Sequence, residues 1–288
     1  MTKWVRAYAA QIRDYINQYG APELIHAHTY LGAMVALELQ NHIPLPYIVT
    51  AHYTGWMDGS IRRHHKALGI AALNGAKKVL AVSRSLKDSM QAMLKQEIEI
   101  CPNFIDFEVF KSDASQKSND FKILGVGDLI PRKQWGHLIQ AYAAIYKDLG
   151  TSKLTIIGDG PLMSDLEKLI KGLNMESYVH LVGRKSKQEV AQAMQRSSVI
   201  VHTSRTETFG LIYLEALACG LPVISYDNGG VNEFRGMKNL EIIPNQKQEL
   251  LKTAIQISSK SFNQPKVTQD VNNVEGIKRY TNLYNSIC

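Results

Sequence analysis

Two glutamates lie close together in residues 203–222, whose sequence reads TSRTETFGLIYLEALACGLP. A strand is expected to end near Ser204, and a helix is expected to begin near Phe209 and Gly210. The first backbone N–H groups of a helix have no partner within it and carry the positive end of its dipole, so this turn is suited to binding phosphate. Glu207 lies just before the predicted helix, and Glu215 follows a little over two turns later on a related face. This combination indicates a site for an anionic ligand, and the alternative is a pair of carboxylates on a solvated helix.

The elements that position these residues follow from a regular alternation of short apolar runs and amphipathic stretches. The apolar runs are rich in Val, Ile and Leu, as is typical of strands covered on both faces. They predict strands at residues 24–28, 47–52, 78–83, 98–103, 121–127, 154–158, 178–183, 199–204, 222–226 and 240–244. Helix-like segments include residues 4–19, 31–40, 135–148, 162–173, 187–195 and 211–219. This βαβα alternation predicts an α/β fold with doubly wound parallel sheets.

The polar, serine-rich segment KSDASQKSND at residues 111–120 is the best candidate for a linker. It divides the chain into a first domain at residues 1–113 and a second domain at residues 119–262. Residues 258–273 are polar and loop-like, and residues 274–287 return to a helical pattern. The C-terminal helix, placed at residues 270–288, is expected to pack back toward the first domain. The first domain opens with a helix instead of the strand and glycine-rich turn that usually begin a doubly wound domain.

The composition is that of a globular protein with a basic balance. The 288 residues are 45% hydrophobic and 20% charged, and the net charge is +7. This charge fits a solvated basic surface, or a surface that attracts anionic lipid or an anionic substrate, whereas the lack of a Lys/Arg block disfavours nucleic acid. Cys101, Cys219 and Cys288 form no CxxC pair, which disfavours a zinc site and a disulfide framework. The sequence shows no secretory signal and no apolar run of about 20 residues, so we expect a cytoplasmic protein.

The segment around the two glutamates resembles a known family motif. Glu207 and Glu215, with Phe209-Gly210 between them and ALACGLPV behind them, closely resemble the motif of family 4 retaining glycosyltransferases, also called glycosyl transferases group 1. Shorter motifs of the same family occur in its order: HAH at 26–28, SRSL at 83–86, PNFID at 102–106, GDGP at 158–161 and GGVNE at 229–233. The resemblance implies the GT-B type of fold, in which two Rossmann-like domains with doubly wound parallel sheets face a cleft.

The resemblance implies catalytic roles for three residues. Glu207 would hold hydroxyl groups of the donor sugar under the reacting carbon. Lys133 would neutralise the diphosphate, where charge grows as the leaving group departs. His52, at the end of the second predicted strand, would lie near the donor sugar and the diphosphate, and a purely structural role is the alternative for a histidine at a strand end.

The resemblance also implies a set of donor-binding residues. Glu215 would accept a hydrogen bond from the nucleotide ribose. The other members are Phe209, Gly210 and Leu211, whose N–H groups would reach sugar and phosphate, Gly127 and Arg132 in the loop before Lys133, and Val182, Gly183 and Arg184, which would border the base. The nucleotide sugar is a substrate, so no cofactor is expected. His26 and His28 share one face of a strand, but no third ligand is apparent and no metal is expected.

Two features depart from the family pattern. Asp128 stands where the family has an arginine, in the stretch GDLIPRK at residues 127–133, and its charge would repel phosphate. Arg132 could supply the missing positive charge. The family's opening strand, glycine-rich loop and following strand or two are absent, which predicts an incomplete N-terminal domain. A truncated gene product, an alternative start and one piece of a split enzyme, completed by a partner chain, are the alternatives.

The resemblance predicts a retaining, metal-independent glycosyltransferase of the hexosyltransferase type. It would transfer a sugar from a UDP- or GDP-sugar to a glycan or lipid-linked acceptor in cell-surface polysaccharide synthesis, with peripheral contact at the anionic inner membrane face. The alternative is a catalytically inactive remnant that binds the nucleotide sugar. A third class is a GT-B-shaped epimerase or phosphorylase, although the lysine pattern of a phosphorylase is not found.

Overall fold

The computed structural model describes residues 2–113 and 120–261, which form two compact units divided between Asn103 and Phe104. This division precedes the linker predicted at residues 111–120, of which residues 114–119 lie outside the described residues. The helix predicted at residues 270–288 also lies outside them. No helix within the described ranges is both long enough and apolar enough to cross a bilayer.

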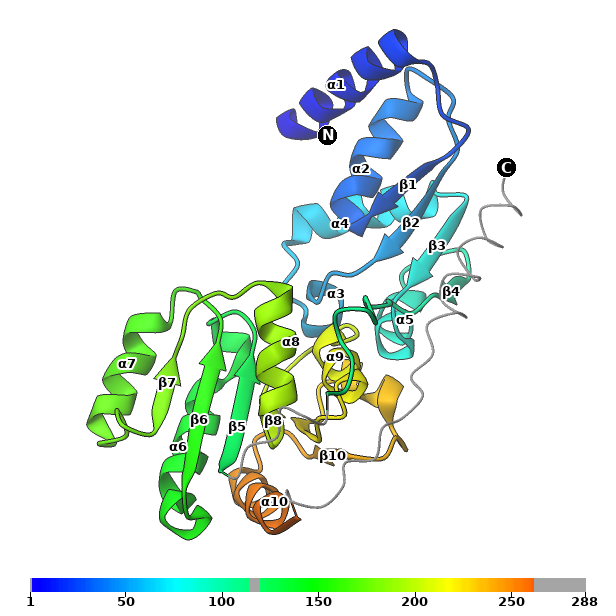
Figure 1. Ribbon diagram of the computed structural model, residues 1–288. Coiled ribbons are helices and arrows are strands. Elements are labelled where there is room, and N and C mark those ends of the chain that lie inside the picture. The colour runs from blue at the N-terminus through cyan, green and yellow to red at the C-terminus, as the bar shows by residue number, and fades with distance from the viewer. Residues whose placement is uncertain (1, 114–119, 262–288) are drawn as a thin grey trace. The chain divides into compact units, whose positions relative to one another are not determined.

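The first unit contains a four-stranded parallel sheet in the order β1-β2-β3-β4 (Figure 1). Its strands are β1 (Ile25–His28), β2 (Tyr47–Ala51), β3 (Lys78–Ala81) and β4 (Ile98–Ile100). Its helices are α1 (Lys3–Tyr19), α2 (Thr29–Gln40), α3 (Gly55–Asp58), α4 (Arg63–Asn74) and α5 (Arg84–Gln91). β2 is buried along its whole length, because β1 and β3 flank it and α2 packs on it. The register pairs His28 with Thr50, so His28 and His52 emerge at the same edge of the sheet.

The second unit contains a six-stranded parallel sheet in the order β10-β9-β8-β5-β6-β7. Its strands are β5 (Phe121–Val126), β6 (Ser152–Ile157), β7 (Val179–Leu181), β8 (Val199–His202), β9 (Val223–Tyr226) and β10 (Leu240–Ile243). Its helices are α6 (Trp135–Ile145), α7 (Met163–Gly172), α8 (Lys187–Arg196), α9 (Leu211–Ala218) and α10 (Gln248–Ser261), with 3-10 turns η2 (Pro131–Lys133), η3 (Tyr146–Leu149) and η4 (Gly230–Phe234). The strand order reverses between β5 and β8, and ligands of open parallel sheets bind outside the carboxyl ends of the strands at such a point.

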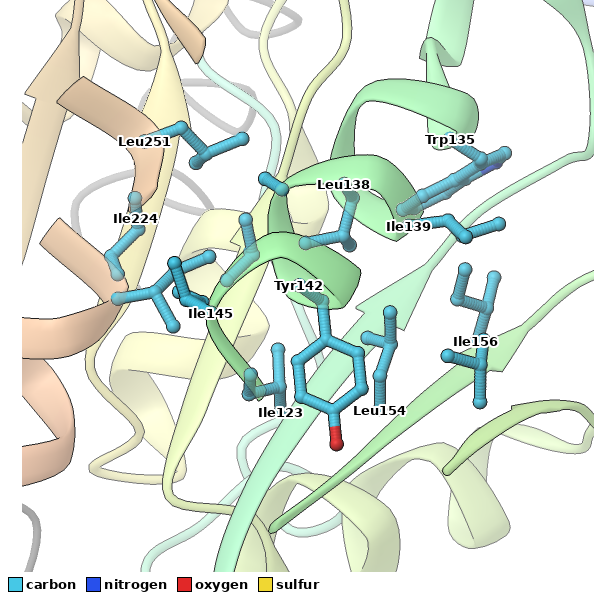
Figure 2. Close-up of a cluster of buried hydrophobic side chains, with 14 of the residues drawn as sticks. Ile123, Trp135, Leu138, Ile139, Tyr142, Ile145, Leu154, Ile156, Ile224 and Leu251 are labelled. Carbon is cyan, nitrogen blue, oxygen red and sulfur yellow. The ribbon is translucent and has the colours of Figure 1, made fainter. Parts of the chain in front are cut away.

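An apolar core joins the sheet of the second unit to α6 and α10 (Figure 2). The α6 side chains in this core are Trp135, Leu138, Ile139, Tyr142 and Ile145. The buried Tyr142 hydroxyl donates to the carbonyl of Ser152 at 3.0 Å, so its polar group is satisfied. This packing anchors the amino end of α6, which begins two residues after Lys133.

The predicted α/β fold with two parallel sheets is confirmed. Each predicted strand and each predicted helix outside residues 262–288 is present, with ends shifted by up to three residues. Helices α3, α4, α5 and α10 lie in segments for which the sequence analysis names no helix. The expected loop at residues 258–273 is wrong for residues 258–261, which continue α10. The hydroxyls of Ser259 and Ser261 donate to the carbonyls of Gln256 and Ile257, so these serines are accommodated within the helix.

Candidate active site

The loops that follow β5 and β8 meet where the strand order reverses. The β5 loop ends in the turn η2, which carries Arg132 and Lys133, and the β8 loop carries Glu207. Two hydrogen bonds from the β8 loop hold η2. The Thr203 hydroxyl donates to the Lys133 carbonyl at 2.9 Å, and the Arg205 N–H donates to the Arg132 carbonyl at 2.9 Å. The sheet topology therefore places two cationic side chains beside Glu207.

Glu207 is 9% exposed and receives three side-chain contacts on one oxygen. Its Oε1 lies 2.7 Å from Lys133 Nζ, 3.2 Å from His202 Nε2 and 3.3 Å from Arg132 Nη1. Arg132 Nη1 also donates to the carbonyl of Thr206 at 2.6 Å, which fixes the guanidinium at this position. The second oxygen, Oε2, accepts no hydrogen bond from the described residues. Oε2 is thus available to a ligand.

The charges around Glu207 do not balance. Burial raises the pKa of Glu207, but the hydrogen bond from His202 and the charge of Lys133 outweigh it, and the pKa lies well below its usual range. Burial and the charge of Lys133 lower the pKa of His202, so its ring is neutral near pH 7. Lys133 and Arg132 therefore bring two positive charges against the one negative charge of Glu207. Such an excess favours binding of an anion.

The turn before α9 is shaped by Gly210. This residue has φ +78°, and a Cβ at this position would lie 2.3 Å from the ring of Tyr213, so the turn requires glycine. The N–H groups of Phe209, Gly210 and Leu211 donate to no backbone carbonyl within the described parts of the chain. They lie at the positive end of α9, where an anion is stabilised. Phe209 itself is buried against Phe234, with ring centroids 5.2 Å apart, so its backbone is held in place.

The turn that follows β6 packs against the β5 loop on one side and against the turn that follows β7 on the other. Gly158 approaches Gly127 so closely that a Cβ on Gly158 would lie 1.9 Å from the Gly127 carbonyl oxygen. Gly127 in turn lies beside Lys133, whose Nζ would be 3.4 Å from a Cβ at position 127. The Gly158 N–H donates to the Gly183 carbonyl at 2.9 Å. The turns that carry Gly127, Gly158 and Gly183 therefore lie next to one another at the carboxyl edge of the sheet.

The residues predicted to hold the nucleoside lie on two further elements. Residues 182–184 follow β7, and the side chains of Val182 and Arg184 are exposed. Glu215 is half-buried on α9, where burial raises its pKa and the charge of Lys187 opposes the rise. Glu215 forms no ion pair with any residue of the described ranges. The two glutamates therefore differ: Glu207 is held by cations, whereas Glu215 lies outside that cluster.

Asp128 does not take part in this cluster. It is exposed, and its backbone carbonyl accepts a hydrogen bond from the Trp135 indole N–H at 3.0 Å. The head groups of Arg132 and Lys133 both reach Glu207 Oε1, within 3.3 Å. The positive charge of the β5 loop at this point thus comes from these two residues.

A buried polar network behind Glu207 was not predicted from the sequence. The Tyr213 hydroxyl accepts from Asn228 Nδ2 at 2.5 Å and lies 3.0 Å from Ser225 Oγ. The Asn228 carbonyl accepts the N–H of Glu207 at 2.9 Å, so the network fixes the backbone that carries the carboxylate. Burial raises the pKa of Tyr213 above its usual range. His202 was missed too, and the available signal was one polar residue at the end of the apolar run VIVH.

His52 belongs to the first unit, where it is one of three neighbouring histidines. Its Nε2 lies 3.0 Å from Nδ1 of His28, and the two rings stack with centroids 5.3 Å apart. The ring of His26 lies 4.5 Å from that of His28, and its Nε2 is 2.7 Å from the Thr50 hydroxyl. Burial and the neighbouring His28 lower the pKa of His52 to about 4, so its ring is neutral near pH 7. Within the described ranges, no group of three or more His, Cys, Asp or Glu side chains is arranged to hold a metal ion.

Residues 106–269 match the family model for glycosyl transferases group 1, and residues 2–109 match the model for Glycosyltransferase Family 4. The chain belongs to this family of glycosyltransferases. The Glu207 cluster lies within the group 1 match, and His52 lies within the Family 4 match. The predicted family membership is confirmed.

Relatives of this chain support the same family assignment. An uncharacterized glycosyltransferase of Methanocaldococcus jannaschii is 30% identical over 215 residues, covering 74% of this chain and 58% of the relative. The N-acetyl-alpha-D-glucosaminyl L-malate synthase of Bacillus anthracis is 33% identical over 165 residues, covering 54% of this chain and 42% of the relative. The matched part of the chain thus spans between about two fifths and three fifths of the length of these two relatives.

Solved structures show the same fold. Sucrose-phosphate synthase from Thermosynechococcus elongatus superposes with a TM-score of 0.84 at 20% identity, covering 98% of this chain and 78% of that chain. Anabaena HepE in complex with UDP gives a TM-score of 0.83 at 20% identity, covering 96% of this chain and 82% of that chain. At this identity the likeness defines the architecture alone, which is that of GT-B glycosyltransferases.

Proposed function

We propose that the second unit binds a nucleoside-diphosphate sugar at the carboxyl ends of β5 and β8, and that the protein transfers the sugar to a hydroxyl acceptor. The observation that carries this proposal is the convergence of Lys133 and Arg132 on Glu207, two residues before a turn whose N–H groups, at 209–211, donate to no described backbone carbonyl. A diphosphate supplies the negative charge that this cluster lacks. The sugar supplies hydroxyl groups for the free oxygen of Glu207.

Each charged group then has a separate task. The diphosphate accepts hydrogen bonds from the N–H groups of residues 209–211 and attracts Lys133 and Arg132. Glu207 accepts hydrogen bonds from the donor sugar through Oε2 and holds the anomeric carbon in place. As the bond from this carbon to the diphosphate breaks, negative charge grows on the leaving phosphate. Fixed cations stabilise that charge more in the transition state than in the ground state, which accelerates the reaction.

The remaining contacts of the donor follow the same proposal. Glu215 accepts a hydrogen bond from the ribose, and residues 182–184 border the base. Lys133 and Arg132 neutralise the diphosphate, as a metal ion does in other enzymes, so the proposed transfer is metal-independent. The transferred sugar keeps its anomeric configuration.

The proposal extends to donor and acceptor classes. The donor is a UDP- or GDP-sugar, and UDP is favoured because HepE structures are described with UDP and UDP-glucose. The acceptor is a glycan or a lipid-linked sugar used in cell-surface polysaccharide synthesis. The alpha-monoglucosyldiacylglycerol synthase of Acholeplasma laidlawii is 27% identical, covering 82% of this chain and 66% of the relative, and its name supports an acceptor that contains a lipid. The net charge of +7 supports peripheral contact with an anionic membrane.

A thermal-shift screen against UDP-, GDP-, ADP- and CMP-sugars tests donor binding, and a transfer assay with the donor that binds tests catalysis. We expect Glu207→Ala to lower turnover by at least about a hundredfold, equivalent to about 2.7 kcal/mol. The matched control is Glu249→Ala, because Glu249 also pairs with a lysine at 2.8 Å but is 86% exposed. Near-normal transfer by Glu207→Ala would remove Glu207 from the mechanism.

A second candidate function is nucleotide-sugar binding without transfer. The observation that favours it is Asp128, an exposed acidic side chain in the loop that carries the two cations. Under this alternative the thermal-shift screen shows a stabilising nucleotide sugar, and no acceptor takes up labelled sugar.

A further inference from the structure

His202 is held rigidly behind the carboxylate of Glu207. It is the last residue of β8, is 1% exposed, and makes T-shaped ring contacts with Trp135 and Tyr213 at centroid distances of 6.0 and 5.3 Å. Its Nε2 lies 3.2 Å from Glu207 Oε1. Because aromatic side chains pack against it on two sides, the imidazole has little freedom to turn.

The hydrogen-bonding partners determine the tautomer of His202. Nε2 lies 3.2 Å from Glu207 Oε1 and 3.5 Å from Lys133 Nζ. A carboxylate can only accept, and Lys133 already donates to it at 2.7 Å, so Nε2 must carry the proton that reaches Glu207. A second proton on Nδ1 would need an acceptor, and Nδ1 has none among the described residues. The ring of His202 is therefore neutral, donates a hydrogen bond from Nε2 to Glu207 and adds no charge to the anion site.

Lys133 and His202 hold Glu207 in different ways. The lysine ammonium sits on a flexible four-carbon stem, whereas the imidazole is fixed by its packing. In the proposed function, on which this inference rests, an arriving diphosphate attracts Lys133 and so weakens its bond to Glu207. Glu207 then needs another donor to keep Oε1 in place and Oε2 directed at the sugar.

We infer that His202 is a positioning residue that fixes the Glu207 carboxylate while Lys133 engages the diphosphate of the donor. Lys133 is the movable partner of Glu207, and His202 is the stationary one. His202 is 1% exposed and acts through Glu207, so its loss is expected to disturb the orientation of the sugar and to leave binding of the diphosphate unchanged.

Two amide variants separate this role from simple packing. In His202→Gln the side-chain NH2 can reach as far as Nε2 does, whereas in His202→Asn it stops near the position of Nδ1. We expect His202→Asn to lower kcat by about tenfold to a hundredfold and His202→Gln to keep kcat within about threefold of wild type. Calorimetric affinity for UDP, which lacks the sugar, should stay within about threefold in both variants. His137→Asn is the control, since His137 also has a buried Nδ1 without a partner among the described residues but does not contact Glu207.

Three results would overturn the inference: equal losses of kcat in the two His202 variants, an unchanged kcat in His202→Asn, or a parallel loss of UDP affinity. Circular dichroism on each variant shows whether it is folded, and if His202→Asn is not, His202→Leu replaces it with the same expectations. Failure of the proposed function itself would look different, because the wild-type protein would then bind no nucleotide sugar at all, and that result would overturn the inference as well.

Discussion

The ion pair between Lys133 and Glu207 allows a quantitative prediction. The two side chains are 12% and 11% exposed, and their charged atoms lie 2.7 Å apart. At an effective dielectric constant of about 20, unit charges at this separation attract by about 6 kcal/mol, but much of that offsets the loss of hydration. Removing one partner leaves the other buried without compensation, so the cost depends on what remains around it.

Glu207→Gln should be the more damaging substitution, because it leaves Lys133 and Arg132 close together without a carboxylate. We expect it to lower the free energy of unfolding by about 3–5 kcal/mol. Lys133→Met should cost about 1–2 kcal/mol, since Arg132 and His202 still donate to Oε1. The double variant should cost less than the sum of the two, with a coupling energy of about 1–3 kcal/mol.

Urea unfolding followed by tryptophan fluorescence measures these free energies. Trp135 is 1% exposed in the second unit, and a Trp4→Phe/Trp56→Phe background confines the signal to it. The control cycle uses Lys252→Met and Glu249→Gln, whose pair lies at 2.8 Å with Glu249 86% exposed, and its coupling should be below about 0.5 kcal/mol. A coupling energy at Lys133–Glu207 no larger than the control, or a Lys133→Met variant less stable than Glu207→Gln, would refute the reasoning.

Two further predictions concern the β5 loop and the histidine cluster. Asp128→Arg should strengthen UDP binding by about tenfold, or 1.4 kcal/mol, because a cation replaces an anion near the diphosphate. Calorimetry on this variant and on an Asp165→Arg control measures the effect. An equal gain of affinity in both variants would contradict the prediction. Acidification from about pH 7.5 to 4.5 should lower the free energy of unfolding of the first unit. In the unfolded chain His52 takes up a proton below its usual pKa near 6.5, whereas in the folded protein its ring stays neutral until about pH 4. Thermal unfolding at the two pH values checks this, because acidification should lower the melting temperature of His52→Gln less than that of wild type. Equal decreases would show that the pKa of His52 is not lowered in the folded protein.

The sequence predicts the fold well because both sheets are built from short buried runs. β8, with sequence VIVH, and β9, with sequence VISY, are buried along their whole lengths, so their apolar residues mark them clearly. Helix α4 was missed because its first turn, RHHK, is polar and hides the later periodicity. The turn before α9 was predicted correctly because Gly210 is required by its positive φ and by the ring of Tyr213.

The internal contacts of the site could not be predicted in the same way. Lys133 and Glu207 meet only because β5 and β8, distant in sequence, are neighbours in the sheet. The strand order also brings the Tyr213–Asn228 hydrogen bond behind Glu207, and no periodicity encodes it. The contact of His52 with His28 follows from the register of two strands, which no motif encodes. Sequence motifs therefore identify the participants, and topology decides which of them touch.

In the proposed function, a diphosphate docks on the N–H groups at the start of α9. Amide hydrogen exchange with and without UDP tests it most directly, because the N–H groups of Phe209, Gly210 and Leu211 donate to no backbone carbonyl within the described chain. We predict that saturating UDP slows exchange at these three amides by at least about tenfold. Unchanged exchange there, with UDP bound and protection confined to other segments, would contradict the account.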